Sequence, residues 1–523
     1  MGKTRRPVLV LGLIVGFISL LVLIRLFNSF RPRLLKIPTI APLADGRFTK
    51  HRNYDSPIIV PLPTVAPIRL NSTIDPNLPP VPNLYSNYSY CQAEYPQSTG
   101  YEAVKGAKLK LVQIVVRHGD RTPVHSTLDT FAEWDCSSRP EISKLEDRAR
   151  LGDGNKDEDK HYADSNESPS IVHRVSIPEK GGYSWAIPTK GNCVRGQLTM
   201  KGMWQHRELG KHLRDIYVDK LNYLPKVLDH TEDVYVRHTY IWRTKQSAMS
   251  LIEGMFPNAT YNNKQPFEFV QYPQEIETMF SNPGACPKLK VTFGQMQQSV
   301  PYKRYIKSQA ALHDELIDIL GSPFGSGDWM NSMEGWMDIL NTHSCHNKQL
   351  PCSSQNKTQC ATTEIVKQLN LAGSFEYAWT KRDDPFAPTY NRLGSGPFVS
   401  ELKRRWEQVN GETEPASRGP KFEVYSAHDD TVSYLLGTLQ AYDMRWPPYA
   451  SNLIFELWER DQPVESGKDS YVFRVIYNGQ VLRVPWADLN EVSYDDFVRY
   501  LQPYIAAPEE LRNECGVVPE GVA

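Results

Sequence analysis

Two arginines flank a histidine in the segment Arg117-His-Gly-Asp-Arg121, which is followed by Thr122 and Pro123. A guanidinium is a planar, permanently charged fork that matches phosphate oxygens. A neutral imidazole held between two such cations keeps a nitrogen lone pair that can attack phosphorus. We therefore expect His118 to be a nucleophile and Arg117 and Arg121 to bind phosphate. An isolated charged cluster is ordinarily a solvated turn, so the neighbouring elements must decide between the two interpretations.

The apolar run from Leu109 to Val116 directly precedes this segment and predicts a buried strand. A second strand is expected at 422–425, and it leads into His428 and Asp429. Open α/β sheets bind their ligands at the carboxyl ends of the strands. If these strands are parallel neighbours, His428 can hydrogen-bond phosphoryl oxygens and Asp429 can protonate the leaving alkoxide. Gly119 would permit an unusual backbone angle or a close approach of the ligand.

A third polar segment contains Arg237 and Arg243 and leads into apolar residues at helical spacing. We expect Arg237 to be a third phosphate clamp. An arginine at the head of a helix more often braces neighbouring carboxylates or carbonyls, so Arg243 is given a supporting role. A metal site is the competing interpretation of the histidines, but they lack partners at zinc-ligand spacing and the arginines would oppose a cation.

In chain order, the segments that contain Arg117, Arg237 and His428 resemble the histidine acid phosphatase family, which is branch 2 of the histidine phosphatase superfamily. The resemblance runs from about Lys108 to about Tyr504. It implies a phosphohistidine intermediate on His118, a proton donor at Asp429 and no cofactor or metal. It also implies an α/β fold with a mainly parallel sheet flanked by helices and an inserted, mostly helical cap.

Further motifs resemble a membrane-anchored branch of acid phosphatase-like proteins that includes 2-phosphoxylose phosphatase: Gly196–His206, Leu213–Tyr217, Cys345–Asn347 and Asn452–Trp458. That resemblance implies a phosphorylated sugar, such as 2-phosphoxylose in a Golgi glycan, as the substrate. A phytase-like inositol-phosphate phosphatase and a catalytically silent phosphate-binding protein are the alternatives. A charged segment between Cys136 and Trp185 fits no motif of the family, and we expect substrate choice to depend on it.

The composition agrees with a large folded body. The chain has 523 residues, of which 40% are hydrophobic, and its 59 basic and 60 acidic residues nearly cancel. Nucleic-acid binding is disfavoured because it requires a basic face of clustered Lys and Arg. We expect a phosphorylated small molecule or glycan as the partner, while the sequence leaves the oligomeric state open.

The N-terminal region predicts a membrane anchor. Residues 8–24 carry no charge and are preceded by basic residues, and no small-residue cleavage site follows. We expect a type II signal anchor within 1–27, a proline-rich lumenal stalk at 28–90 and the phosphatase domain at 91–523. A short apolar span suits the early secretory membranes, which favours the Golgi.

Eight cysteines and five Asn-x-Ser/Thr sequons favour an oxidising lumen. The sequons begin at Asn71, Asn87, Asn166, Asn258 and Asn356. An even number of cysteines permits complete pairing, and the cluster Cys345, Cys352 and Cys360 predicts at least one local disulfide loop. A zinc site formed by His343, Cys345, His346 and Cys352 is the weaker alternative.

Two local predictions concern helices and strands that position the site. Thr199 is expected to cap a helix whose inner stripe includes His206, a histidine that we interpret as a core residue. The runs 471–477 and 481–484, joined by Asn478-Gly479, predict a β-hairpin that adds antiparallel edge strands to the sheet.

Overall fold

The computed structural model describes residues 88–125, 133–134, 136, 190–191, 193–228, 231–257, 268–321, 333–411, 419–462 and 470–516. The expected anchor, nearly all of the stalk, the charged segment after Cys136 and four of the five sequons lie outside these residues. In the described part of the chain, no helix is both long and apolar enough to span a bilayer.

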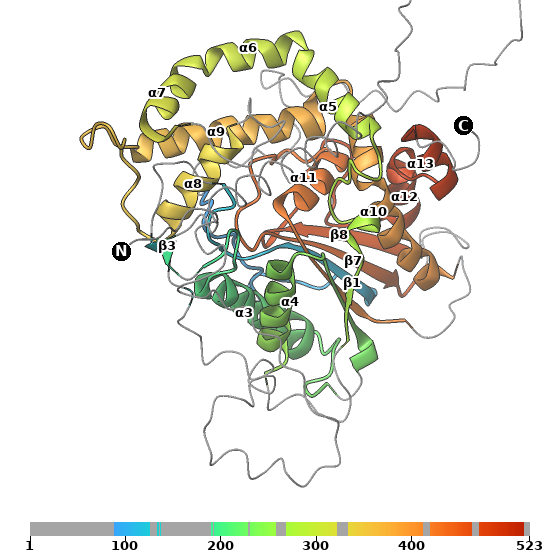
Figure 1. Cartoon of the computed structure of the whole chain (residues 1–523). Helices are drawn as coiled ribbons and strands as arrows, with labels where there is room; N and C mark the ends of the chain where they lie inside the picture. The colour runs from blue at the N-terminus through green and yellow to red at the C-terminus, as the bar shows by residue number, and fades with distance from the viewer. Residues whose placement is uncertain are drawn as a thin grey trace, which may run out of the picture. The chain divides into compact units, whose positions relative to one another are not determined.

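One eight-stranded sheet forms the centre of the domain (Figure 1). Its order is β10-β8-β7-β1-β6-β4-β5, and β9 pairs with β8. The strands are β1 (Ala107–Arg117), β4 (Val234–His238), β5 (Phe269–Gln271), β6 (Phe422–Ala427), β7 (Asn452–Arg460), β8 (Tyr471–Tyr477), β9 (Gln480–Val481) and β10 (Val492–Ser493). A separate parallel pair joins β2 (Glu133–Trp134) to β3 (Lys190–Gly191).

The sheet is mixed, which corrects the expected mainly parallel arrangement. Strands β1, β6, β4 and β5 are parallel, whereas β7, β8, β9 and β10 pair antiparallel to their neighbours. The predicted hairpin is confirmed as β8 and β9, and its turn residues Asn478 and Gly479 both have positive φ, at 48° and 80°. More strands are antiparallel than the predicted hairpin alone, because β7 pairs antiparallel with the central strand β1.

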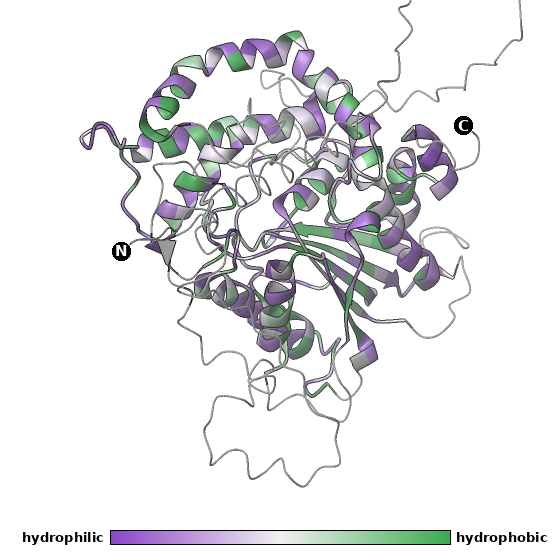
Figure 2. Ribbon diagram, viewed as in Figure 1, coloured by the Kyte–Doolittle hydropathy of each residue, from purple (hydrophilic) through white to green (hydrophobic). Residues whose placement is uncertain are grey.

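Helices cover both faces of the sheet because side chains alternate along each strand. On β1, Val115 packs with the helices on one face, while Ile114 and Val116 pack on the other. Figure 2 shows the central strands as largely hydrophobic. The first face carries α10 (Ala387–Asn410), α11 (Asp429–Thr438) and α12 (Tyr494–Leu501), and the second carries α3 (Met200–Arg214) and α4 (Trp242–Met255). The short helix α13 (Pro508–Glu514) packs beside α10.

Helix α3 begins after Thr199, whose side chain accepts a hydrogen bond from the Gly202 amide, so the predicted cap is confirmed. His206 is fully buried on the helix, and its Nε2 lies 3.0 Å from the Arg117 carbonyl oxygen. It is therefore a core residue, as predicted, and its contact with Arg117 holds the end of β1.

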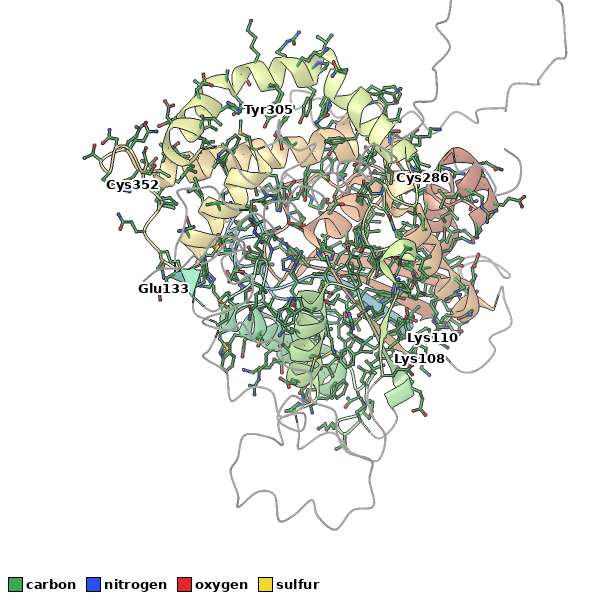
Figure 3. All side chains as sticks on the ribbon, in the orientation of Figure 1. Lys108, Lys110, Glu133, Cys286, Tyr305 and Cys352 are labelled. Atoms are coloured by element: carbon green, nitrogen blue, oxygen red, sulfur yellow. A yellow bond between two sulfur atoms is a disulfide. The ribbon has the colours of Figure 1, made fainter. Side chains whose placement is uncertain are left out.

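The expected helical insertion lies between β5 and β6. It contains α5 (Lys288–Gln298), α6 (Val300–Ser308), α7 (Ala310–Leu320), α8 (Glu334–Cys345) and α9 (Thr363–Ala378), with a core of its own. Figure 3 shows Cys352, on the α8–α9 connection, far from Lys108 and Lys110 near the start of β1. The carboxyl end of β1 thus points toward the cap.

Four disulfides use all eight cysteines: Cys91–Cys345, Cys136–Cys193, Cys286–Cys515 and Cys352–Cys360. The last one closes the predicted local loop. The alternative zinc site fails because both of its cysteines are oxidised.

Candidate active site

The loop after β1 and the start of α11 meet because β1 and β6 are parallel neighbours in register. Arg117 pairs with Ala427, and the His118 amide donates a hydrogen bond to the Ala427 carbonyl at 2.9 Å. The next residue on each strand is a histidine, and the ring centroids of His118 and His428 lie 5.7 Å apart. The expected adjacency of the two segments is therefore confirmed.

Close backbone packing fixes the loop against the N-terminus of α3. A Cβ on Gly119 would lie 2.3 Å from the Gly202 carbonyl oxygen, and one on Gly202 would lie 2.2 Å from the Asp120 carbonyl oxygen. Neither glycine has a positive φ. Gly119 is thus needed because its backbone packs closely against that of Gly202, rather than because it adopts an unusual backbone angle.

His118 is buried and neutral. Burial lowers its pKa well below the usual 6.5, and Arg243, Arg117 and Arg121 lower it further. Its Nδ1 lies 2.8 Å from the Gly119 carbonyl oxygen, which can only accept a hydrogen bond. Nδ1 therefore carries the proton, and Nε2 has a free lone pair.

Arg117 is fully buried behind the loop and is held on several sides. Its Nη1 donates to the Pro447 carbonyl at 2.5 Å, and its Nη2 lies 3.0 Å from the Tyr90 hydroxyl and 2.9 Å from an Asp429 carboxylate oxygen. The guanidinium also lies 4.3 Å from the ring centroid of Tyr449. These contacts fix its orientation.

Arg121 is paired with a carboxylate that the sequence did not reveal. Its Nη1 donates to Asp338 Oδ1 at 2.6 Å, and Asp338 Oδ2 accepts from the amides of Val124 and His125. Burial alone would raise the pKa of Asp338, but Arg121 and the local hydrogen bonds keep it below its usual value. Helix α8 of the cap is thereby tied to the arginine of the loop.

The structure does not bring Arg237 into this constellation. Alternation along β4 turns Arg237 toward α10, where it pairs with buried Glu277 and with Glu401. Tyr272 covers its guanidinium with ring centroid at 3.6 Å. This arginine is occupied by structural carboxylates.

Arg243, which was given only a supporting role, lines the cavity instead. It lies in the first turn of α4, and among the described residues its Nε has no hydrogen-bond partner. Burial, followed by repulsion from Arg121, lowers its pKa to about 9. Its charge is therefore poorly compensated before an anion binds.

His428 and Asp429 differ sharply in charge. Burial and the neighbouring Arg243 lower the pKa of His428 to about 3, and its Nε2 lies 3.0 Å from the Thr239 hydroxyl. Burial alone would raise the pKa of Asp429, but Arg117 and Arg121 lower it to about 2. Trp446 Nε1 also donates to Asp429 at 2.9 Å. The histidine is neutral and the aspartate is a carboxylate in the free site.

His118, Arg121, Arg243 and Asp429 surround a cavity of about 110 Å³, whereas Arg117, Arg237 and His428 are not among its lining residues. Its lining consists of Tyr90, His118, Arg121, Val124, His125, Arg243, Glu334, Met337, Asp338, Asp429 and Trp446. Within the described residues, no cluster of three or more His, Cys, Asp or Glu side chains could hold a metal ion. The arrangement presents a neutral nucleophile and cations to an anion.

Sequence reasoning missed Tyr90, Trp446, Glu334 and Asp338. The last two are four residues apart, a spacing that places them on one face of a helix and that could have been noticed. Tyr90 and Trp446 carry no local signal, because their roles arise only from distant contacts.

A family model and two relatives in sequence agree with this geometry. The family described as "Histidine phosphatase superfamily (branch 2)" matches residues 108–478. Counting factor 60 of Dictyostelium discoideum is 30% identical over 405 residues, covering 75% of this chain and 84% of that protein. The 2-phosphoxylose phosphatase 1 of Homo sapiens is 27% identical over 416 residues, covering 77% of each chain. The apo phytase of Hafnia alvei is 14% identical, with a TM-score of 0.49 over 79% of this chain and 99% of that chain.

Proposed function

The chain belongs to branch 2 of the histidine phosphatase superfamily and is a phosphoric monoester hydrolase; we propose that it acts through a covalent phosphohistidine on His118. The observation that carries this proposal is the state of that side chain. Its Nδ1 proton is held by the Gly119 carbonyl, and the depressed pKa keeps Nε2 available as a nucleophile.

The phosphate of the substrate is held by Arg121 and Arg243, which line the cavity, and by Arg117, which lies behind Asp429. Charge-assisted hydrogen bonds from guanidinium groups stabilise the negative charge that spreads over the transferring phosphoryl oxygens. In this proposal Arg243 takes the place of Arg237 as the third clamp, because Arg237 is occupied by Glu277 and Glu401.

Asp429 is proposed as a proton donor to the leaving oxygen, and His428 as a neutral hydrogen-bonding partner of the phosphoryl group. In the free site Asp429 is ionised. A bound phosphate dianion competes for the guanidinium of Arg117 and adds negative charge nearby, so it raises the pKa of Asp429 toward the working range. Water then attacks the phosphohistidine in the second step and releases phosphate.

A phosphorylated sugar, such as 2-phosphoxylose in a glycan, is the proposed substrate. The support is the similarity to 2-phosphoxylose phosphatase 1 of several vertebrates, at 24–27% identity. We place the enzyme in the secretory pathway, as a type II membrane protein of the Golgi with a lumenal catalytic domain. The four disulfides support an oxidising compartment.

The test is hydrolysis of a substrate panel by the full-length chain from a secretory host, at mildly acidic pH. The panel contains a 2-phosphoxyloside, other sugar phosphates and phytate, and His118→Ala is the matched inactive control. Preference for the phosphoxyloside supports the proposed substrate, whereas preference for phytate supports an inositol-phosphate phosphatase. Phosphate binding without turnover would show a silent binding protein and contradict the proposal.

A further inference from the structure

Helix α8 of the cap contributes one wall of the catalytic cavity. Glu334, Met337 and Asp338 all line the space that His118 and Asp429 also line. His118, Arg121 and Arg243 line the same cavity, so a phosphate ester bound there shares its space with the cap residues. The cavity is therefore lined by the carboxyl groups of Glu334, Asp338 and Asp429. Only a protonated carboxyl group can donate a proton to a leaving oxygen.

Two of the three carboxyl groups are ionised. Asp338 accepts hydrogen bonds from Arg121 and from the amides of Val124 and His125, and its pKa is lowered. The pKa of Asp429 is lowered to about 2. Neither group holds a proton in the free enzyme at mildly acidic pH.

Glu334 is in the opposite state. Burial is the largest influence on it, and the carboxylates of Asp429, Asp430, Asp338 and Glu376 act in the same direction, which raises its pKa to about 8.

The groups that face this carboxyl come from several elements. Asp429 and Asp430 begin α11, Asp338 lies one turn along α8, and Glu376 lies on α9. The cavity also contains cationic or titratable groups on the loop after β1 and on α4, namely His118, Arg121, His125 and Arg243. With these groups counted, the pKa of Glu334 remains raised, so its carboxyl is neutral at mildly acidic and neutral pH.

We propose that Glu334, on the cap wall of the cavity that His118 and Asp429 also line, is a second proton donor to the leaving oxygen. This inference rests on the proposed function of the same site. The bond from His118 Nε2 to phosphorus forms as the bond from phosphorus to the leaving oxygen breaks. On this route the electron pair stays on that oxygen, which takes its proton from Glu334 rather than from Asp429 and leaves a carboxylate on Glu334. When water attacks the phosphohistidine, its proton returns to this carboxylate.

The experiment compares two substrates whose leaving groups differ in their need for a proton. A sugar or glycerol phosphate releases a basic alkoxide, whereas p-nitrophenyl phosphate releases a stable phenolate. The variant Glu334→Gln keeps the shape of the side chain but has no proton to give. We expect its kcat/KM for the alkyl phosphate to fall about 100-fold and that for p-nitrophenyl phosphate to change little.

The pH profile gives a second readout that a structural role would not change. In the wild-type enzyme, kcat/KM for the alkyl phosphate should fall as pH rises through about 8, and Glu334→Gln should lack this step. Glu315→Gln, an exposed carboxyl change on cap helix α7, is the matched control and should behave as wild type.

Equal losses on both substrates, or no loss on either, would overturn the role of Glu334 while leaving the phosphohistidine mechanism intact. Failure of the wild-type chain to hydrolyse either substrate would overturn both the inference and the proposed function.

Discussion

The variant Arg243→Met is expected to lose activity but keep its stability. The variant Arg237→Met is expected to lose stability but keep its activity. Arg243 lines the cavity, and its charge is poorly compensated there. Arg237 is buried between Glu277 and Glu401 and does not line the cavity. The two arginines are only six residues apart, so the pair forms a matched test of the proposed phosphate clamp.

Loss of one preorganised donor to a developing anion costs about 3–4 kcal/mol, so Arg243→Met should lower kcat/KM by about 10²–10³. The same substitution should not lower the free energy of unfolding. The pKa of Arg243 falls from 12.5 to about 9 on folding, so the charged side chain opposes folding at every pH below about 9. At about 1.4 kcal/mol per pH unit, the upper bound of this cost is about 5 kcal/mol. The variant should be at least as stable as the wild type at pH 5–7.

Arg237→Met leaves two carboxylates without their cation. Breaking a buried pair in this way typically costs about 3–5 kcal/mol. Glu277 is the more costly of the two, because burial already raises its pKa. The melting temperature should therefore fall, while kcat/KM of the folded protein stays near that of the wild type.

The assay combines steady-state kinetics with thermal unfolding, with and without inorganic phosphate. Phosphate should stabilise the wild type and Arg237→Met, and should stabilise Arg243→Met much less, because ligand binding to the native state raises stability by mass action. Wild-type kinetics in Arg243→Met would refute the reasoning. So would a loss of kcat/KM in Arg237→Met without a loss of stability.

Three further predictions concern packing, modification and pH. Gly202→Ala should cost about 1–3 kcal/mol of unfolding free energy, because its Cβ would lie 2.2 Å from a backbone oxygen, whereas Gly294→Ala, with open space around it, should not destabilise. In secretory expression, Asn356→Gln should remove one N-glycan, since this exposed sequon accepts a hydrogen bond from the Thr358 hydroxyl; unchanged electrophoretic mobility would contradict this. The ion pair between Asp429 and Arg117 should stabilise the native state above about pH 4, and this stabilisation should be lost between about pH 4 and 2. The melting temperatures of the wild type and of Asp429→Asn should therefore converge as the pH falls. A difference in melting temperature that stays constant with pH would contradict this.

The elements that carry the site could be predicted because their signals are local. The apolar run before Arg117 predicts β1, and Thr199 predicts the start of α3. Asn478-Gly479 predicts its hairpin because both residues tolerate positive φ. The central pairing of β7 with β1 could not be predicted, because nothing local specifies which strands become neighbours.

The position of Arg237 away from the cavity could not be predicted, for a physical reason. Consecutive strand residues face opposite sides of a sheet, so one position decides whether an arginine meets the ligand or the helix behind it. The carboxylates that occupy Arg237 come from residues 277 and 401, which are distant in the sequence. The cap acids likewise reach the cavity only through tertiary packing of α8.

The most direct test of the central claim is to trap the phosphorylated enzyme. The full-length chain is mixed with substrate, stopped rapidly in alkali and digested, and the phosphorylated peptide is identified by mass spectrometry. The mechanism predicts one phosphoryl group on Nε2 of His118, formed at the rate of the first turnover. Turnover in the His118→Ala variant, or a wild-type enzyme that turns over without this phosphohistidine, would contradict it.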